Sequence, residues 1–166
     1  MSKILLTSFT TWLPHQKSNS SDDLLVAISQ LHHTSSLTFL RNLPVDVEQA
    51  SSCVINKINE LVPDIIICCG MAEGRNQLSI ESNACCGDSV LRTNIDLDLL
   101  VTEPIQISHN AGKFVCEGLY YAVLKYIIDR QLKIKCIFVH VPILGENKLN
   151  FVENFMLVLQ KIGDYE

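Results

Sequence analysis

Two almost uninterrupted apolar runs constrain the fold of this chain more than any other feature. They are DIIICC at 64–69 and IKCIFVHVP at 134–142, both rich in β-branched residues and both without the regular polar alternation of a half-exposed strand. Strands of this kind are buried on both faces, which happens when helices cover both sides of a parallel sheet. The two runs therefore predict an α/β fold with both strands near its centre.

Helical and extended patterns alternate along the rest of the chain. Apolar residues at helical spacing predict helices over 21–33, 45–61 and 148–162, and Ser21 or Asp22 is the expected cap of the first. Residues 94–101 are expected to form a short helix or a strand, and the helix is favoured. Further strands are predicted over 3–8, 36–42 and 105–109, whereas residues 77–89 fit neither pattern. This alternation is typical of a three-layer α/β/α sandwich with a mostly parallel open sheet, and we expect a single domain over residues 1–166.

The charge and hydropathy of the chain argue against two classes of binding partner, nucleic acids and membranes. The net charge is −5 and lysines and arginines do not cluster, so no nucleic-acid partner is expected. No apolar run approaches the roughly 18 residues that span a bilayer, so no membrane partner is expected either. The first residues, MSKILLTSF, lack a small-residue cleavage site and are predicted to form a strand rather than a signal peptide. Together these features predict a cytoplasmic protein.

Cys116 differs from the other six cysteines of the chain in its surroundings. It follows the turn sequence NAG at 110–112 and lies in a stretch where apolar residues recur every three or four positions from Val115 to Tyr126. Cys116 is therefore expected in the first turn of a helix that follows a strand. We expect the other six to be buried as small apolar residues, because the sequence has no C-x-x-C pair and no disulfide framework.

A cysteine in the first turn of a helix is a candidate nucleophile. The unpaired N–H groups of that turn favour a thiolate, so we expect a lowered pKa for Cys116, and they can also hold an oxyanion. His140 is the favoured base because it ends the predicted strand 134–142 at the same edge of the sheet. The remaining histidines are predicted in a loop, at the end of an exposed helix or in a strand: His15, His32, His33 and His109. The group that orients His140 stays open among Glu81, Glu103 and Asp88.

Four sequence blocks resemble those of the type I, cysteine-dependent pyroglutamyl peptidases. They are LLTSFTTW at 5–12, PDIIICCGMAEGR at 63–75, SIES at 79–82, and NAGKFVCEGLYY at 110–121 followed by FVHVP at 138–142. The resemblance implies Cys116 as nucleophile, His140 as general base and then acid, and Glu81 as the group that orients His140. It also implies a pocket for the substrate ring lined by Phe9, Trp12, Met71, Phe114 and Val115.

The reaction implied by this resemblance is removal of an amino-terminal pyroglutamyl residue from a peptide through a thioacyl-enzyme, without a metal or organic cofactor. A homo-oligomer is also consistent with the family. The sequence departs from the family pattern where CCGDSVLRTNIDL at 85–97 replaces a longer loop, and where Met71 replaces a frequent glutamine. Two other functions stay open: hydrolysis of a different small amide or blocked amino terminus by the same three groups, and ligand binding by a non-catalytic relative.

Overall fold

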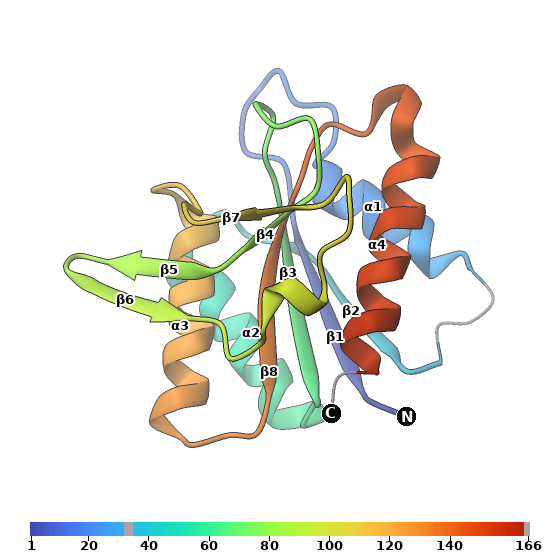
Figure 1. The fold of residues 1–166 in the computed structure, drawn as a ribbon. Coiled ribbons are helices and arrows are strands. Elements are labelled where there is room, and N and C mark those ends of the chain that lie inside the picture. Colours follow the sequence, from blue (N-terminus) through green and yellow to red (C-terminus); the bar gives the residue numbers. More distant parts are fainter. Residues whose placement is uncertain (32–34, 165–166) are drawn as a thin grey trace.

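The structure is a computed structural model, and it describes residues 1–31 and 35–164. Six strands form one sheet in the order β2-β1-β3-β8-β4-β7, and β5 and β6 form a second, two-stranded sheet (Figure 1). The strands are β1 (Ile4–Phe9), β2 (Leu37–Leu43), β3 (Ile65–Met71), β4 (Ser79–Glu81), β5 (Asn83–Cys86), β6 (Ser89–Arg92), β7 (Gln106–Ser108) and β8 (Lys135–Val141). The helices are α1 (Ser20–Ser29), α2 (Val47–Leu61), α3 (Val115–Asp129) and α4 (Lys148–Gly163), with short 3-10 helices η1 (Leu97–Leu99) and η2 (Gly145–Asn147).

The predicted α/β/α architecture with a mostly parallel sheet is confirmed. Among the described residues, every pair of neighbouring strands in the large sheet is parallel except β4 with β8. Helices α1 and α4 lie on one face of this sheet, and α2 and α3 lie on the other (Figure 1). None of the described helices is long and apolar enough to cross a membrane.

Strand alternation assigns each side chain of the central strands to one of two cores. Ile65 and Ile67 of β3 pack in the core against α1 and α4, whereas Ile66 packs in the core against α2 and α3. Successive side chains point to opposite faces of a strand. Because Phe138 of β8 belongs to the α2/α3 core, His140 lies on that same face of the sheet. The candidate site is therefore on the α2/α3 side.

The first helix begins one residue earlier than predicted, because its cap is Asn19 rather than Ser21 or Asp22. The Asn19 side-chain oxygen accepts a hydrogen bond from the backbone N–H of Ser21 at 3.0 Å. A side chain with this bond satisfies one of the N–H groups that a helix leaves unpaired at its start. The helix ends at Ser29, and the predictions for the two histidines at 32–33 lie outside the described residues.

The predicted helix over 94–101 is wrong, since only Leu97–Leu99 form a single 3-10 turn there. Thr93 and Asn94 donate side-chain hydrogen bonds of 2.6 Å and 2.8 Å to backbone carbonyls of the segment 134–136. These bonds hold Thr93 and Asn94 beside the start of β8. Side-chain bonds of this kind compete with helix formation.

Residues 77–89, which fitted no pattern, form β4 and most of the β5–β6 hairpin. The hairpin packs on α3, where Tyr121 donates a hydrogen bond of 2.8 Å to the Ser89 hydroxyl. Three of the six cysteines predicted to be buried are not: in this hairpin Cys86 is exposed and Cys85 is half-buried, and Cys53 is exposed on α2. Cys116, the candidate nucleophile, is half-buried. Cys68, Cys69 and Cys136 lie in central strands and are buried as expected.

Candidate active site

His140 and Glu81 face each other across two neighbouring antiparallel strands. In the register of β4 with β8, Ser79 pairs with His140 and Glu81 pairs with Phe138, so Glu81 and His140 are diagonal neighbours on one face. The Glu81 Oε1 atom lies 2.6 Å from Nδ1 of His140. Both side chains are buried, with 0% and 6% of their surface exposed. Because Nδ1 is engaged with a carboxylate, Nε2 is the ring nitrogen that can exchange a proton with a nucleophile.

Cys116 lies in the first turn of α3, and its sulfur occupies space that a glycine leaves open on the sheet. A β-carbon added at Gly70 would lie only 2.5 Å from the Cys116 Sγ atom. Gly70 of β3 is in turn the register partner of His140 on β8. The sulfur therefore lies over the strand next to His140, near the carboxyl ends of both strands. Cys116 and His140 line the same cavity of about 670 Å³.

The start of α3 presents donors for an oxyanion beside the sulfur. Phe114, the residue before the helix, is extended at φ −117° and ψ −162° and makes no side-chain capping bond. The first N–H groups of a helix have no partner within it, so those of Val115, Cys116 and Glu117 are directed outward from the turn. Developing negative charge on an attacked carbonyl oxygen is stabilised by such groups.

Arg75 contacts the Glu81–His140 pair and extends it to a group of three side chains. The sequence patterns did not single out Arg75. It follows β3 in the turn GMAEGR, and its Nη1 donates to Glu81 Oε1 at 2.7 Å. Burial acts to raise the pKa of Glu81, but hydrogen bonds with His140 and Ser108 and the positive charges of His140 and Arg75 outweigh it, so the pKa is lowered. The carboxylate is therefore held in its ionised form.

The expectation of a lowered pKa for Cys116 is wrong for this arrangement. Burial raises the pKa of the Cys116 thiol to about 12, and the negative charge of Glu81 adds to the rise. The charge of Arg75 and a backbone hydrogen bond act in the opposite direction but are weaker. The helix terminus therefore does not by itself produce a thiolate. A nearby base can remove the proton as the sulfur attacks, and His140 lines the same cavity as Cys116.

The five predicted pocket residues all lie around Cys116. Trp12, Met71, Phe114 and Val115 line the large cavity. A smaller cavity of about 30 Å³ next to it is lined by Phe9, Trp12, Asn19, Val45, Met71, Val115 and Cys116. The rings of Trp12 and Phe114 lie 6.2 Å apart and remain 53% and 73% exposed, although large apolar side chains are usually buried. These two rings form an apolar rim at the mouth of the site.

The two other carboxylates considered for the orienting role are not at His140. Asp88 lies between β5 and β6, Glu103 precedes β7, and both are exposed. Tyr120 is a further contributor that the sequence did not indicate, because its hydroxyl donates to the backbone carbonyl of Glu81 at 2.9 Å. Among the described residues, no group of three or more His, Cys, Asp or Glu side chains could hold a metal ion.

Comparison with known proteins gives one family. The family model described as pyroglutamyl peptidase matches residues 2–101 and 100–161. The chain is 25% identical over 151 residues to a pyrrolidone-carboxylate peptidase of Brevibacillus brevis, with 74% of this chain and 70% of that protein covered. It is 32% identical over 133 residues to pyrrolidone-carboxylate peptidase 1 of Caldanaerobacter subterraneus, with 63% and 64% covered. The chain thus spans about two thirds of the length of these relatives.

Solved structures share the fold. Pyroglutamyl peptidase I of Bacillus amyloliquefaciens superimposes with a TM-score of 0.86 at 20% identity, covering 99% of this chain and 98% of the other. Pyrrolidone carboxyl peptidase of Thermococcus litoralis gives a TM-score of 0.82 at 18% identity, covering 99% and 94%. The same three-layer arrangement is therefore present in these enzymes.

Proposed function

The chain belongs to the pyroglutamyl peptidase family, and from this membership and the site we propose that it is a cysteine peptidase that removes amino-terminal pyroglutamate from peptides. The observation that supports this most is the 2.6 Å contact of Glu81 with His140, in a cavity that Cys116 also lines. A nucleophile, a base and a group that orients the base are the parts that thiol-acyl chemistry needs.

In the proposed reaction, His140 Nε2 takes the proton of the Cys116 thiol as the sulfur attacks the carbonyl carbon of the pyroglutamyl amide. The carbonyl oxygen becomes an oxyanion that the N–H of Cys116 and its neighbours in the helix turn stabilise. The C–N bond then breaks, and the imidazolium of His140 gives its proton to the leaving amine. Water, deprotonated by His140, attacks the resulting thioester, so that pyroglutamate leaves and the thiol is restored. Glu81 keeps the imidazole oriented through Nδ1 in every step.

The walls of the two cavities fit this substrate. A pyroglutamyl ring is small, uncharged and mainly apolar, which suits the pocket formed by Phe9, Trp12, Met71 and Val115 beside the sulfur. Phe114 lies at the entrance, against Trp12. The larger cavity extends past Val47 and Cys85, and we assign this part to the peptide that follows the ring.

The proposal includes a cytoplasmic location, which the seven unpaired cysteines of the described chain support because thiols persist in reducing compartments. Assembly into a homo-oligomer is part of the same proposal. Light scattering on the eluting protein during size-exclusion chromatography measures the mass directly. A mass equal to that of one chain would rule out the oligomer.

The experiment that tests the substrate is a panel of aminomethylcoumarin amides given to the wild-type protein under reducing conditions. We expect release of the fluorophore from the pyroglutamyl amide, and much slower release from the prolyl, glutamyl and acetyl-alanyl amides. The prolyl ring has the size of the lactam but lacks its second carbonyl, so it is the matched control. Faster cleavage of the acetyl-alanyl amide would identify a hydrolase for another blocked amino terminus. Cleavage of none of the amides would contradict the peptidase.

A further inference from the structure

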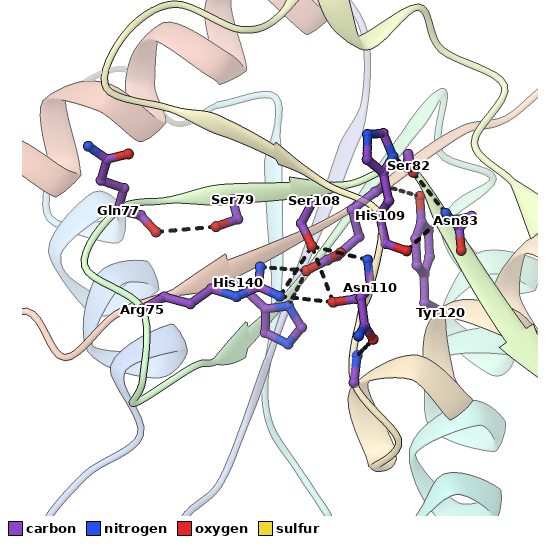
Figure 2. Close-up of polar contacts among 12 residues, drawn as sticks. Arg75, Gln77, Ser79, Ser82, Asn83, Ser108, His109, Asn110, Tyr120 and His140 are labelled. Atoms are coloured by element: carbon purple, nitrogen blue, oxygen red, sulfur yellow. Dashed lines mark hydrogen bonds and ion pairs between the residues drawn. The ribbon is translucent and has the colours of Figure 1, made fainter.

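We propose that Arg75 is a positioning residue of the active site, which joins the Glu81–His140 pair to the segment that places Cys116. The inference rests on the proposed function and adds a residue to it. Figure 2 shows the Arg75 side chain ending among His140, Ser108 and Asn110. Its guanidinium donates to Glu81 Oε1 at 2.7 Å, to the backbone carbonyl of Asn110 at 2.9 Å and to the Ser108 hydroxyl at 3.2 Å.

The first of these contacts acts on the base. The same oxygen, Glu81 Oε1, accepts from Arg75 at 2.7 Å and lies 2.6 Å from His140 Nδ1. A carboxylate shared in this way cannot rotate without breaking one of the two contacts. A guanidinium is planar and directs its donors rigidly, so Arg75 fixes the position of Oε1 and hence the direction of the imidazole that contacts it.

The second contact acts on the nucleophile. Asn110 lies in the segment 109–114 between β7 and α3, and Cys116 is the second residue of that helix. The segment turns through Gly112, which has φ +90° and whose N–H donates to the Asn110 side chain at 2.9 Å. Arg75 holds the backbone carbonyl at the start of this turn. One side chain therefore connects the two halves of the catalytic apparatus, which come from segments far apart in the sequence.

The charge of Arg75 has a second consequence. An ionised Glu81 near Cys116 opposes a thiolate and, equally, the oxyanion that forms during attack. After burial, which dominates, Cys68 and then the charge of Glu81 raise the pKa of Cys116, whereas the charge of Arg75 lowers it. Arg75 thus allows an anionic carboxylate to orient the imidazole at a smaller electrostatic cost to the sulfur.

Arg75→Lys and Arg75→Gln separate these two effects. Lysine keeps the charge but lacks the planar fork, whereas glutamine lacks the charge. The matched control is Arg41→Gln, because Arg41 makes a bidentate ion pair with Asp22 at 2.8 Å and 2.9 Å away from the site. The readouts are kcat and KM for pyroglutamyl-aminomethylcoumarin, and the rate at which iodoacetamide alkylates Cys116, with Cys116→Ala as the background.

We expect kcat to fall about 10- to 100-fold in both Arg75 variants with little change in KM, because misplaced catalytic groups slow the chemical step. Alkylation of Cys116 between about pH 7 and pH 9 should slow about 3- to 10-fold in Arg75→Gln and little in Arg75→Lys, since a tenfold change corresponds to one pKa unit. The Arg41→Gln protein should match the wild type in both assays.

The proposal would be overturned if the Arg75 variants kept the wild-type kcat and alkylation rates but melted at a lower temperature. Arg75 would then stabilise the fold without positioning the catalytic groups. If Arg75→Gln does not fold, the kcat of Arg75→Lys alone tests the proposal, and a wild-type kcat in that variant would overturn it. A wild-type protein that cleaves no pyroglutamyl amide would contradict the proposed function. The alkylation rates would in that case still decide on Arg75, because they need no substrate.

Discussion

Each side chain that we propose as catalytic depends on a residue that makes room for it or holds it. Gly70 makes room for the Cys116 sulfur, and Glu81 fixes one nitrogen of the His140 ring. The sequence placed Cys116 and His140 at one edge of the sheet, because strand ends and helix starts meet there in an α/β fold. Arg75 could not be found in this way. Its partners come from segments whose proximity depends on the folded chain.

Gly70→Ala should abolish most activity. The added β-carbon would lie 2.5 Å from Cys116 Sγ and 2.9 Å from the ring of Phe138, and both distances are too short for real contacts. The sulfur must leave its place over β3, and overpacking of this kind costs about 1–3 kcal/mol of folding free energy. Gly163→Ala, where nothing lies within 4 Å of the new carbon, is the control. Kinetic assays and thermal melts of the two variants check this, and full activity of Gly70→Ala would refute the placement of the sulfur.

Glu81→Gln should make stability less sensitive to acid. The pKa of Glu81 in the folded protein is below its ordinary value of 4.5, so its stabilising contribution is present above that pH and is lost as the pH falls through the folded-state pKa. The free energy of unfolding of the wild type, measured with urea, should therefore fall below about pH 5. In the variant this free energy should depend less steeply on pH in that range. Glu153→Gln, on the exposed part of α4, should keep the wild-type slope. Identical slopes in all three proteins would contradict the ionised Glu81.

At the scale of elements, length decided what the sequence could predict. The long helices α2, α3 and α4 and the central strands β3 and β8 contain enough residues to show their periods. The strands β4, β5 and β6 have only three or four residues each, which is too short for any alternation to be recognised. β4 exists because it pairs with β8 and β7, and this pairing is what places Glu81 beside His140. The sequence of residues 79–81 alone does not predict that pairing.

Asn19 caps helix α1 and also contacts the segment beside the proposed substrate pocket. These two functions can be separated by substitution. Its side-chain oxygen caps α1, and its Nδ2 donates to the carbonyl of Thr10 at 3.1 Å, which holds the segment carrying Trp12. Asn19→Asp keeps the cap but replaces this donor with a carboxylate oxygen that repels the Thr10 carbonyl, so KM should rise. Asn19→Ala loses both and should in addition destabilise the protein by about 1 kcal/mol. An unchanged KM in both variants would show that the contact with Thr10 does not shape the pocket.

At the scale of the whole molecule, the site lies on one face of a sheet that also has a core on its other face. Phe155 of α4 is fully buried in the core against α1, away from Cys116. If residues 1–166 are one domain, Phe155→Ala should lower the free energy of unfolding by about 3–5 kcal/mol. The site should then be lost at the same urea concentration as the helices. Circular dichroism and loss of activity, followed together, check this. Two separate transitions would contradict a single domain.

One assay tests most directly whether Cys116 is the nucleophile of a pyroglutamyl peptidase. Hydrolysis of pyroglutamyl-aminomethylcoumarin is compared between the wild type, Cys116→Ala and Cys53→Ala under reducing conditions, Cys53 being an exposed cysteine on the outer part of α2. We predict full activity in the wild type and in Cys53→Ala, and none in Cys116→Ala that is as well folded. Activity retained without Cys116 would contradict the account.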